Sequence, residues 1–206
     1  MIRLIVIAAL ASLVGCQPAV AWQPPANAER YQRELTRIVQ QTWGLDGSVA
    51  VHAAQIQQES AWRPEVDSPV GAQGLAQFMP STSAWIADIY PDSLGPAAPY
   101  SPGWAMRAMA RYDRWIWQRV DAANSCERWA MTLSGYNGGL GWVWRDQKLA
   151  RAAGDNPGIW FGSVANYTAR AGWAKEENRD YVDRILLRYT PAYVSAWGGR
   201  SPCYRF

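Results

Sequence analysis

Apolar and small residues recur at helical spacing in the first part of the chain. Between Asn27 and Trp43 they stand at Tyr31, Leu35, Ile38, Val39 and Thr42. This spacing predicts one helix, capped by Asn27 and ended by Gly44. Ser48 can cap a second helix, which we expect to reach Glu59 or just beyond. Regular structure then ends at the Trp-Arg-Pro triplet 62–64, because the residue before a proline avoids the α region.

The middle of the chain is richer in glycine and proline. Residues 68–74 contain two glycines and a proline, which predicts a tight loop with room for a small β-hairpin over 65–75. A short helix across Gln77 and another over 81–89 are expected next. Residues 91–102 contain four prolines and predict a loop.

The second half predicts four further helices, over residues 101–120, 125–134, 142–152 and 175–197. Four glycines within 135–141 require the chain to bend there, and Pro191 should break or kink the last helix. Alternating strand patterns are nearly absent. The sequence therefore predicts a mainly α, compact single domain over residues 27–206.

The N-terminus has the pattern of an export signal. Arg3 precedes an apolar stretch over residues 4–14, whose eleven residues are far fewer than the roughly 20 that cross a bilayer. Two cleavage sites compete within residues 1–21, and a spacer follows to residue 26. Leu-Val-Gly-Cys ending at Cys16 resembles a lipobox, which would make Cys16 a lipidated N-terminus, whereas Ala-Val-Ala ending at Ala21 is an ordinary site. We favour the lipobox, and with it a periplasmic outer-membrane lipoprotein.

Either route leaves Cys126 and Cys203 as the two unmodified thiols. In an oxidising compartment such a pair can form a disulfide, which would tie the C-terminal tail to the middle of the domain. Two separate buried thiols are the alternative.

Composition excludes several function classes. The net charge of +3 gives no bulk field for nucleic acid, and no run of like charges suggests a tail that binds it. His52 is the only histidine and no cysteine pair has ligand spacing, so we expect no metal and no cofactor. A serine nucleophile on a Gly-x-Ser-x-Gly turn and a Walker phosphate loop are also absent. Carboxylates remain as the catalytic candidates.

Two features point to carbohydrate. Thirteen tryptophans and ten tyrosines against three phenylalanines suit stacking on sugar rings, although most of these rings must serve the core. Glu59 ends the apolar segment 49–60, and an apolar setting raises the pKa of a carboxyl group. A carboxyl that stays protonated near neutrality is the general acid required to break a glycosidic bond.

Three segments resemble the lytic transglycosylases of the soluble (SLT) type, whose fold is shared with goose-type lysozyme. They are Glu59-Ser60 with Ser68 and the run 71–80 (Gly-Ala-Gln-Gly-Leu-Ala-Gln-Phe-Met-Pro), residues 135–139 (Gly-Tyr-Asn-Gly-Gly), and residues 177–182 (Glu-Asn-Arg-Asp-Tyr-Val). The resemblance covers roughly residues 45 to 190. Asn178 departs from it, because the family has threonine there.

The resemblance implies an activity and its residues. Glu59 would be the single general acid and base in cleavage of the MurNAc–GlcNAc bond, leaving a 1,6-anhydro product. The residues that it places around the substrate are Ser68, Gln77, Phe78, Met79, Tyr136, Asn137, Glu177 and Tyr181. Tyr136 matches a tyrosine whose hydroxyl can reach the catalytic carboxyl, and Asn137 would bind the N-acetyl group or its own loop. For Tyr181 we weigh a packing role and a substrate-binding role equally.

Two other functions remain open. A hydrolytic muramidase of goose-lysozyme type would need a second acid to activate water, for which Glu65, Asp67 and Glu177 are the nearest candidates. A non-enzymatic peptidoglycan-binding module would retain its role after Glu59→Gln. In every case we expect a monomer that contacts peptidoglycan glycan strands, with membrane attachment only through a lipidated Cys16.

Overall fold

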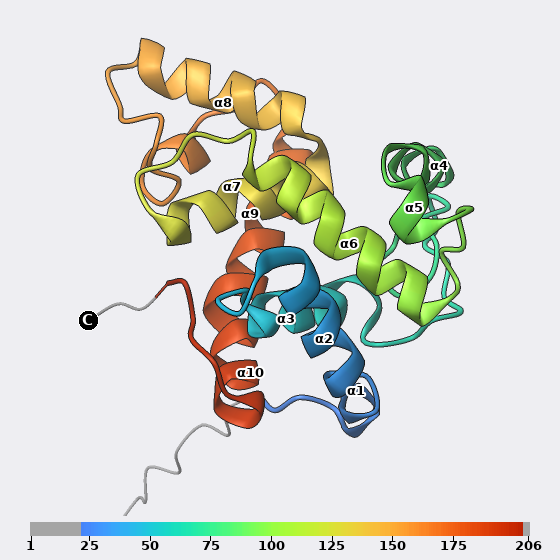
Figure 1. Ribbon diagram of the computed structural model, residues 1–206. Helices are drawn as coiled ribbons and strands as arrows, with labels where there is room; N and C mark the ends of the chain where they lie inside the picture. The colour runs from blue at the N-terminus through green and yellow to red at the C-terminus, as the bar shows by residue number, and fades with distance from the viewer. Residues whose placement is uncertain (1–21, 204–206) are drawn as a thin grey trace, which may run out of the picture.

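Helices account for most of the chain in the computed structural model, which describes residues 22–203 (Figure 1). The α-helices are α1 (Ala26–Glu29), α2 (Gln32–Trp43), α3 (Val49–Ser60), α4 (Pro80–Ile89), α5 (Pro91–Leu94), α6 (Pro102–Trp117), α7 (Ser125–Gly138), α8 (Leu140–Ala152), α9 (Gly172–Asp183) and α10 (Thr190–Trp197). A 3-10 turn covers Val164–Asn166, and a π-helical segment over Arg184–Tyr189 joins α9 to α10. The prediction of a mainly α domain is confirmed.

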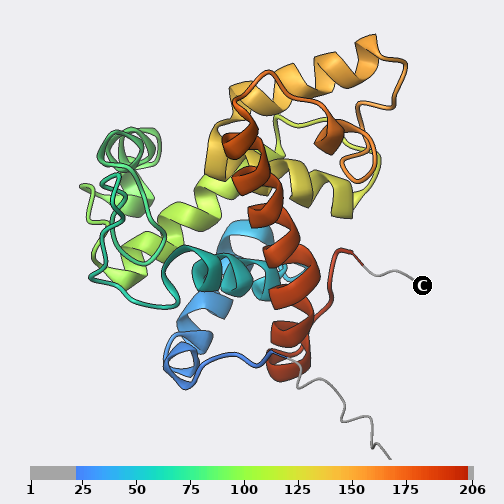
Figure 2. The same cartoon turned by 180° about the vertical axis from the view of Figure 1, so that it is seen from behind.

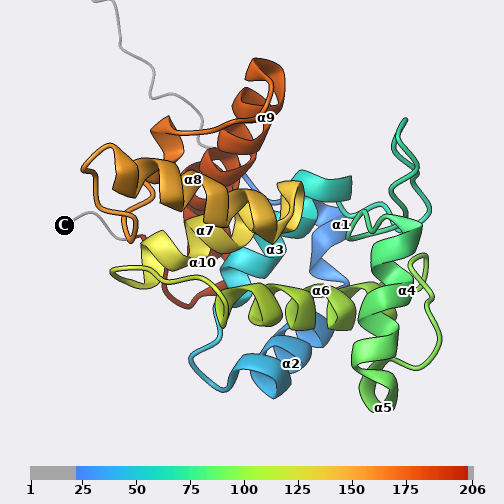
Figure 3. The ribbon, with the colours of Figure 1, turned by 90° about the horizontal axis from the view of Figure 1, so that it is seen from above.

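The long helix α6 crosses the middle of the molecule, with α4 and α5 near one end and α7 and α8 toward the other (Figure 3). Helix α2 packs along α6. Helix α3 is buried along most of its length and packs against α2, α10 and the π-helical segment. Ala50, Ala53 and Ala54 are fully or almost fully buried, and their small side chains allow the neighbouring helices to approach closely.

The two ends of α3 are fixed by different contacts. The Ser48 hydroxyl accepts a hydrogen bond from the Val51 amide, so Ser48 is the predicted N-cap. After α3, Ala61 and Trp62 both have positive φ (50° and 63°), a region that costs a side chain roughly 1–3 kcal/mol. Trp62 is fully buried and its indole N–H donates to the Tyr193 hydroxyl (2.6 Å), which offsets that strain. The turn just after Glu59 is therefore held rigidly.

Several predicted boundaries were wrong. The single helix expected over 27–43 is divided at Tyr31, whose ring turns inward and stacks on the Trp62 ring. Gln77 lies in a turn with φ of 49°, where no helix can form. The proline-rich stretch 91–102 contains α5, because Pro91 occupies its first turn without needing an N–H partner. The bend expected across 135–141 is confined to Gly139, since α7 continues to Gly138.

Helix α9, the π-helical segment and α10 form one continuous rod (Figure 2). The irregularity predicted at Pro191 lies one turn earlier. Pro191 has no N–H to donate to a carbonyl of the preceding turn, which is the wider π-helical turn. There the Thr190 hydroxyl donates to the Ile185 carbonyl (2.7 Å).

The expected hairpin is present only as isolated bridges, Asp67 with Gln73 and Gln73 with Phe78. Within residues 22–203 no helix is long and apolar enough to cross a membrane. The predicted export signal, the lipobox at Cys16 and the site after Ala21 lie outside the described residues.

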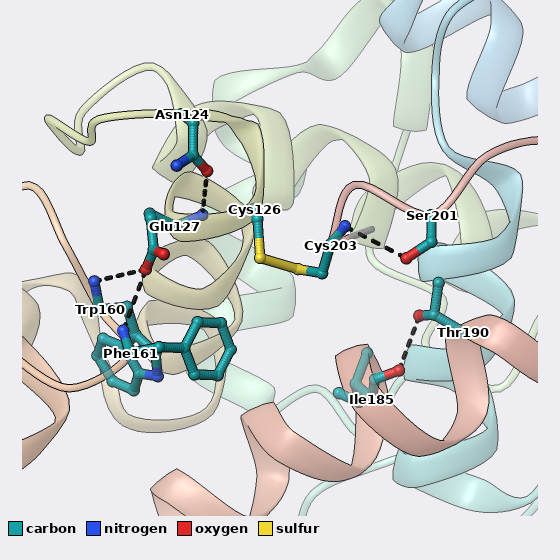
Figure 4. Close-up of a disulfide and its surroundings, with 9 residues drawn as sticks. All are labelled: Asn124, Cys126, Glu127, Trp160, Phe161, Ile185, Thr190, Ser201 and Cys203. Atoms are coloured by element: carbon teal, nitrogen blue, oxygen red, sulfur yellow. Dashed lines mark hydrogen bonds between the residues drawn. A yellow bond between two sulfur atoms is a disulfide. The ribbon is translucent and has the colours of Figure 1, made fainter. Parts of the chain in front are cut away.

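Cys126 and Cys203 form a disulfide between the start of α7 and the C-terminal segment, with their Cα atoms 4.7 Å apart (Figure 4). Beside it, Asn124 caps α7 by accepting from the Glu127 amide (3.1 Å). The Glu127 carboxylate accepts the amides of Trp160 (2.6 Å) and Phe161 (3.1 Å). These contacts anchor the first turn of α7.

Replacing both cysteines by serine should lower the free energy of unfolding by about 4 kcal/mol, because the crosslink closes a long loop in the unfolded chain. The residue separation is 77. Urea unfolding of the oxidised protein and of the double variant measures the difference. A reductant should destabilise the wild type and leave the variant unchanged, and equal stability of the two oxidised proteins would contradict the expectation.

Candidate active site

Glu59 lies in the last turn of α3, partly buried, at a cleft of about 390 Å³. The cleft is lined by Glu59, Ser68, Val70, Ala72, Gln77, Phe78, Met79, Thr82, Tyr112, Tyr136, Asn137, Gly139 and Glu177. Seven of the eight residues predicted around the substrate thus share one cleft with Glu59, and Tyr181 is the eighth. A larger hollow of about 710 Å³ lies beside Arg30 and Trp197, but none of the predicted site residues lines it.

Tyr181 lies against Glu59 and is itself buried. Its hydroxyl donates to Oε1 of Glu59 at 2.5 Å. Burial raises the pKa of Glu59 to about 8, and the hydrogen bond from Tyr181 lowers it by a smaller amount. Glu59 is therefore a neutral acid near pH 7, with Oε1 engaged by Tyr181 and the other oxygen available to carry the proton.

The Tyr136 hydroxyl, expected to be within reach of Glu59, makes its hydrogen bond to another group. That hydroxyl donates to the Ala76 carbonyl (2.7 Å), so it ties α7 to the loop that forms the opposite wall. The pKa of Tyr136 is raised well above its usual value by burial and, to a smaller degree, by the charge of Glu59. Tyr136 is thus a neighbour of the acid and a lining residue of the cleft.

The loop between α3 and α4 is held by its own polar side chains. The Ser68 hydroxyl accepts a hydrogen bond from the backbone N–H of Ala72 (2.9 Å). The side-chain nitrogen of Gln77 donates to the carbonyls of Val66 (3.0 Å) and Gly74 (2.8 Å). Gly74 has φ of 72°, and a side chain there would collide with the Pro99 carbonyl. Ser68 and Gln77 therefore shape the wall of the cleft, and both still line it.

Phe78 and Met79 differ in their settings. Phe78 is buried among the rings of Trp104, Tyr112 and Tyr136, whereas Met79 is 42% exposed at the rim. Of the two, Met79 is the apolar surface that a ligand can contact.

A second hollow of about 320 Å³ adjoins the cleft, since both are lined by Thr82 and Tyr112. Trp85 meets Trp115 edge-on, with ring centroids 5.1 Å apart, and meets Tyr112 at 5.7 Å. Ser81 and Leu140 complete this aromatic hollow, in which no charged residue takes part. The excess of tryptophan in the sequence suggested stacking surfaces but did not indicate which rings would form them.

A buried polar cluster lies between α3 and α6 and was not anticipated. Asp113, His52 and Gln55 are all fully buried. Gln55 donates to Oδ1 of Asp113 (3.3 Å), and Nε2 of His52 lies 3.8 Å from Oδ2. Because Nδ1 of His52 donates to the Ser48 carbonyl (2.8 Å) and burial lowers the pKa of His52 to about 4, the imidazole is neutral with its proton on Nδ1.

Asp113 is a second buried carboxyl group, and the charge of Glu59 affects its pKa. Its pKa is raised well above the usual value, chiefly by burial, and the charge of Glu59 raises it further. Asp113 does not line the cleft. A single aspartate on an otherwise apolar and basic helix belongs to no local motif, so Asp113 could not be singled out from the sequence.

Of the three acids considered as a second catalytic group, only Glu177 lines the cleft. Glu65 and Asp67 are exposed and do not line the cleft, and Asp67 accepts a hydrogen bond from the Tyr100 hydroxyl (2.8 Å). Glu177 is exposed and does line it. In the part of the chain that the structure describes, no group of three or more histidine, cysteine or acidic residues could hold a metal ion.

Known proteins are similar to this chain in sequence. The family described as Transglycosylase SLT domain matches residues 37–158. A membrane-bound lytic murein transglycosylase F of Vibrio campbellii is 30% identical over 149 residues, which are 66% of this chain and 26% of that protein. A soluble lytic murein transglycosylase of Salmonella typhimurium is 38% identical over 80 residues, 38% of this chain and 12% of its own.

A solved structure supports the same relationship. The 70 kDa soluble lytic transglycosylase of Escherichia coli superposes with a TM-score of 0.57 and 25% identity, over 81% of this chain and 25% of that one. The chain belongs to the SLT transglycosylase family. It spans about a quarter or less of the length of the relatives named above.

The raised pKa of Glu59 predicts how stability depends on pH. In the folded protein Glu59 keeps its proton up to about pH 8, whereas a glutamate with the ordinary pKa of 4.5, as in the unfolded chain, loses it there. The stabilisation is therefore complete below pH 4.5 and is lost as the pH rises through 8. Urea unfolding over this range should show the wild type losing stability relative to Glu59→Gln.

Tyr181→Phe provides the control for this expectation. It removes the hydrogen bond that favours the charged form of Glu59, so the pKa of Glu59 should rise further. The loss of folding stability should then extend to higher pH. A difference between wild type and Glu59→Gln that stays constant from pH 4 to 9 would contradict the assignment.

Proposed function

We propose that this protein is a peptidoglycan lytic transglycosylase in which Glu59 is the only catalytic acid and base. The observation that carries the proposal is the neutral carboxyl of Glu59, which opens on the cleft while Tyr181 holds its other oxygen. Membership of the SLT family makes cleavage of the glycan strand the matching reaction.

In the proposed reaction Glu59 gives its proton to the oxygen between MurNAc and GlcNAc. The C1–O bond breaks through an oxocarbenium-like state, and the GlcNAc side leaves as an alcohol. The resulting Glu59 carboxylate then takes the proton of the MurNAc C6 hydroxyl, whose oxygen bonds to C1. The products are a 1,6-anhydroMurNAc end and a protonated Glu59, so water is not consumed and no second carboxylate is required.

The placement of the acids favours this reaction over hydrolysis. A muramidase needs a carboxylate that activates water on the far side of the sugar. Glu177 is the one former candidate that lines the cleft, and its exposed position at the rim suits contact with substrate. Asp113 is fully buried and does not line the cleft, so it cannot hold an attacking water there.

The glycan strand would continue from the cleft into the aromatic hollow. Tyr112 and Thr82 belong to both, and Trp85 offers an exposed ring for a sugar to stack on. The absence of charged groups from the lining residues of this hollow suits an uncharged sugar ring better than the carboxylates of a stem peptide.

The proposal includes the cellular setting. Residues 1–21 would direct export to the periplasm, a spacer would follow to residue 26, and residues 27–206 would form the catalytic domain, acting as a monomer. Cys16 would carry a lipid and attach the protein to the outer membrane. The mass of the mature N-terminus distinguishes cleavage before Cys16 from cleavage after Ala21.

Digestion of purified peptidoglycan, followed by mass analysis of the muropeptides, tests the reaction. Anhydro ends are expected from the wild type, and Glu59→Gln should lose at least about 100-fold in rate because it removes general acid–base catalysis. Reducing ends would show a muramidase. Products from neither protein, despite binding of glycan strands, would show a non-enzymatic binding module.

Trp85→Ala tests the path of the strand. Losing one stacking surface should raise KM about 3- to 10-fold on long glycan strands and leave short ones unaffected, since a short strand does not reach the aromatic hollow. Trp144→Ala is the matched control, because Trp144 is 50% exposed and lines neither hollow. Equal effects of Trp85→Ala on long and short strands would place the strand elsewhere.

A further inference from the structure

Asn137 lines the cleft together with Glu59, and its side chain ends in two different groups, an acceptor and a donor. We propose that Asn178 is a positioning residue that fixes the amide of Asn137. In this orientation Asn137 presents its NH₂ group to the cleft, where it donates to the acetamido carbonyl of a bound sugar. This inference rests on the proposed function for the identity of the sugar, and on hydrogen bonds within the protein for the orientation.

One end of the Asn178 amide must be its oxygen. Arg179 can only donate, and its Nη1 lies 2.8 Å from Oδ1 of Asn178. The Ser134 hydroxyl donates to the same oxygen at 2.7 Å. These two donors determine which end of the Asn178 amide is oxygen.

Arg179 is in turn held by groups that can only accept. Its Nη2 donates to Oδ2 of Asp146 (2.8 Å) and to the Tyr167 carbonyl (2.9 Å), and its Nε donates to the Ala165 carbonyl (3.0 Å). Asp146 is fully buried and lies 3.6 Å from Arg170 as well, so two arginines surround this carboxylate and Arg179 is the one that hydrogen-bonds it. The guanidinium is therefore a fixed donor.

The other end of Asn178 is its NH₂ group. It donates to the Ser134 carbonyl (3.1 Å) and to the Asn137 side chain (2.7 Å). A donor must meet an acceptor, so the Asn137 atom at this contact is Oδ1. Asn178 is 1% exposed and its four hydrogen bonds use both ends of the amide, which leaves it no alternative orientation.

The consequence for Asn137 follows directly. With Oδ1 directed at Asn178, its Nδ2 is the polar end left for the cleft. Both sugars of the proposed substrate carry an acetamido carbonyl, which accepts from N–H groups. A sugar without its acetyl group presents an ammonium there, which cannot accept and is repelled by a donor.

The test compares N-acetylated glycan strands with chemically de-N-acetylated strands. The readout is the ratio of kcat/KM for the two strand types. Asn178→Asp replaces the donor by an oxygen, so Asn137 should turn its NH₂ group inward and present its carbonyl to the cleft. We expect the preference of the wild type for N-acetylated strands to fall at least about 10-fold, the scale of one mispaired hydrogen bond.

Two further variants and a control keep the test decisive. Asn178→Thr, the residue that the family resemblance places there, replaces the amide by a shorter hydroxyl that can donate or accept, so the orientation of Asn137 is no longer dictated and the preference should fall less than in Asn178→Asp. Asn137→Ala should lose the preference as well. Asn166→Asp makes the same chemical change at an exposed asparagine outside the cleft and should leave the ratio unchanged.

The outcomes separate the two proposals. If the wild type cleaves and the ratio is unchanged in Asn178→Asp, Asn178→Thr and Asn137→Ala, the orientation proposal is wrong and the proposed function stands. If the wild type does not cleave, the same ratio is measured as binding affinity for the two strand types. An unchanged binding ratio in the three variants would then reject the orientation proposal independently.

Discussion

The hydrogen bond between Tyr181 and Glu59 is the interaction on which the cleft depends. It joins α9 to α3 across 122 residues of sequence. Burial alone would leave the carboxyl free to rotate, and a freely rotating acid cannot deliver its proton in one direction. The phenol occupies one oxygen and leaves the other for chemistry. Burial remains the larger influence on the pKa, so the acid stays protonated in spite of its partner.

The sequence predicted the helices well where periodicity and capping agreed. Ser48 illustrates this, because a capping side chain acts on its own neighbours and needs no tertiary information. Boundaries failed where a distant side chain decided the backbone. Tyr31 interrupts a regular helical pattern because Trp62 supplies a buried surface for its ring, and no local rule contains that contact.

The candidate site was predictable in membership but not in detail. The motifs placed Glu59 and its neighbours in one cleft, but they did not indicate that Tyr181 rather than Tyr136 would donate a hydrogen bond to Glu59. The Tyr136 hydroxyl donates its hydrogen bond to the Ala76 carbonyl. A motif cannot indicate this partner, because Ala76 meets Tyr136 only in the folded chain. Asp113 and Trp85 carry no motif at all. Their importance arises from α6 and α4 lying beside the cleft, which is known only after the chain has folded.

Helix α7 is restrained at both ends. In its first turn Cys126 forms the disulfide with Cys203, and the Glu127 carboxylate accepts hydrogen bonds from the backbone N–H groups of residues 160 and 161. In its last turn Asn137 accepts a hydrogen bond from Asn178. The helix behaves as a strut, with roughly 16 Å separating Cys126 from Asn137 at 1.5 Å of rise per residue. Formation of the disulfide therefore restrains the same helix whose last turn carries Asn137, so one covalent bond far from the cleft helps to hold a residue that lines it.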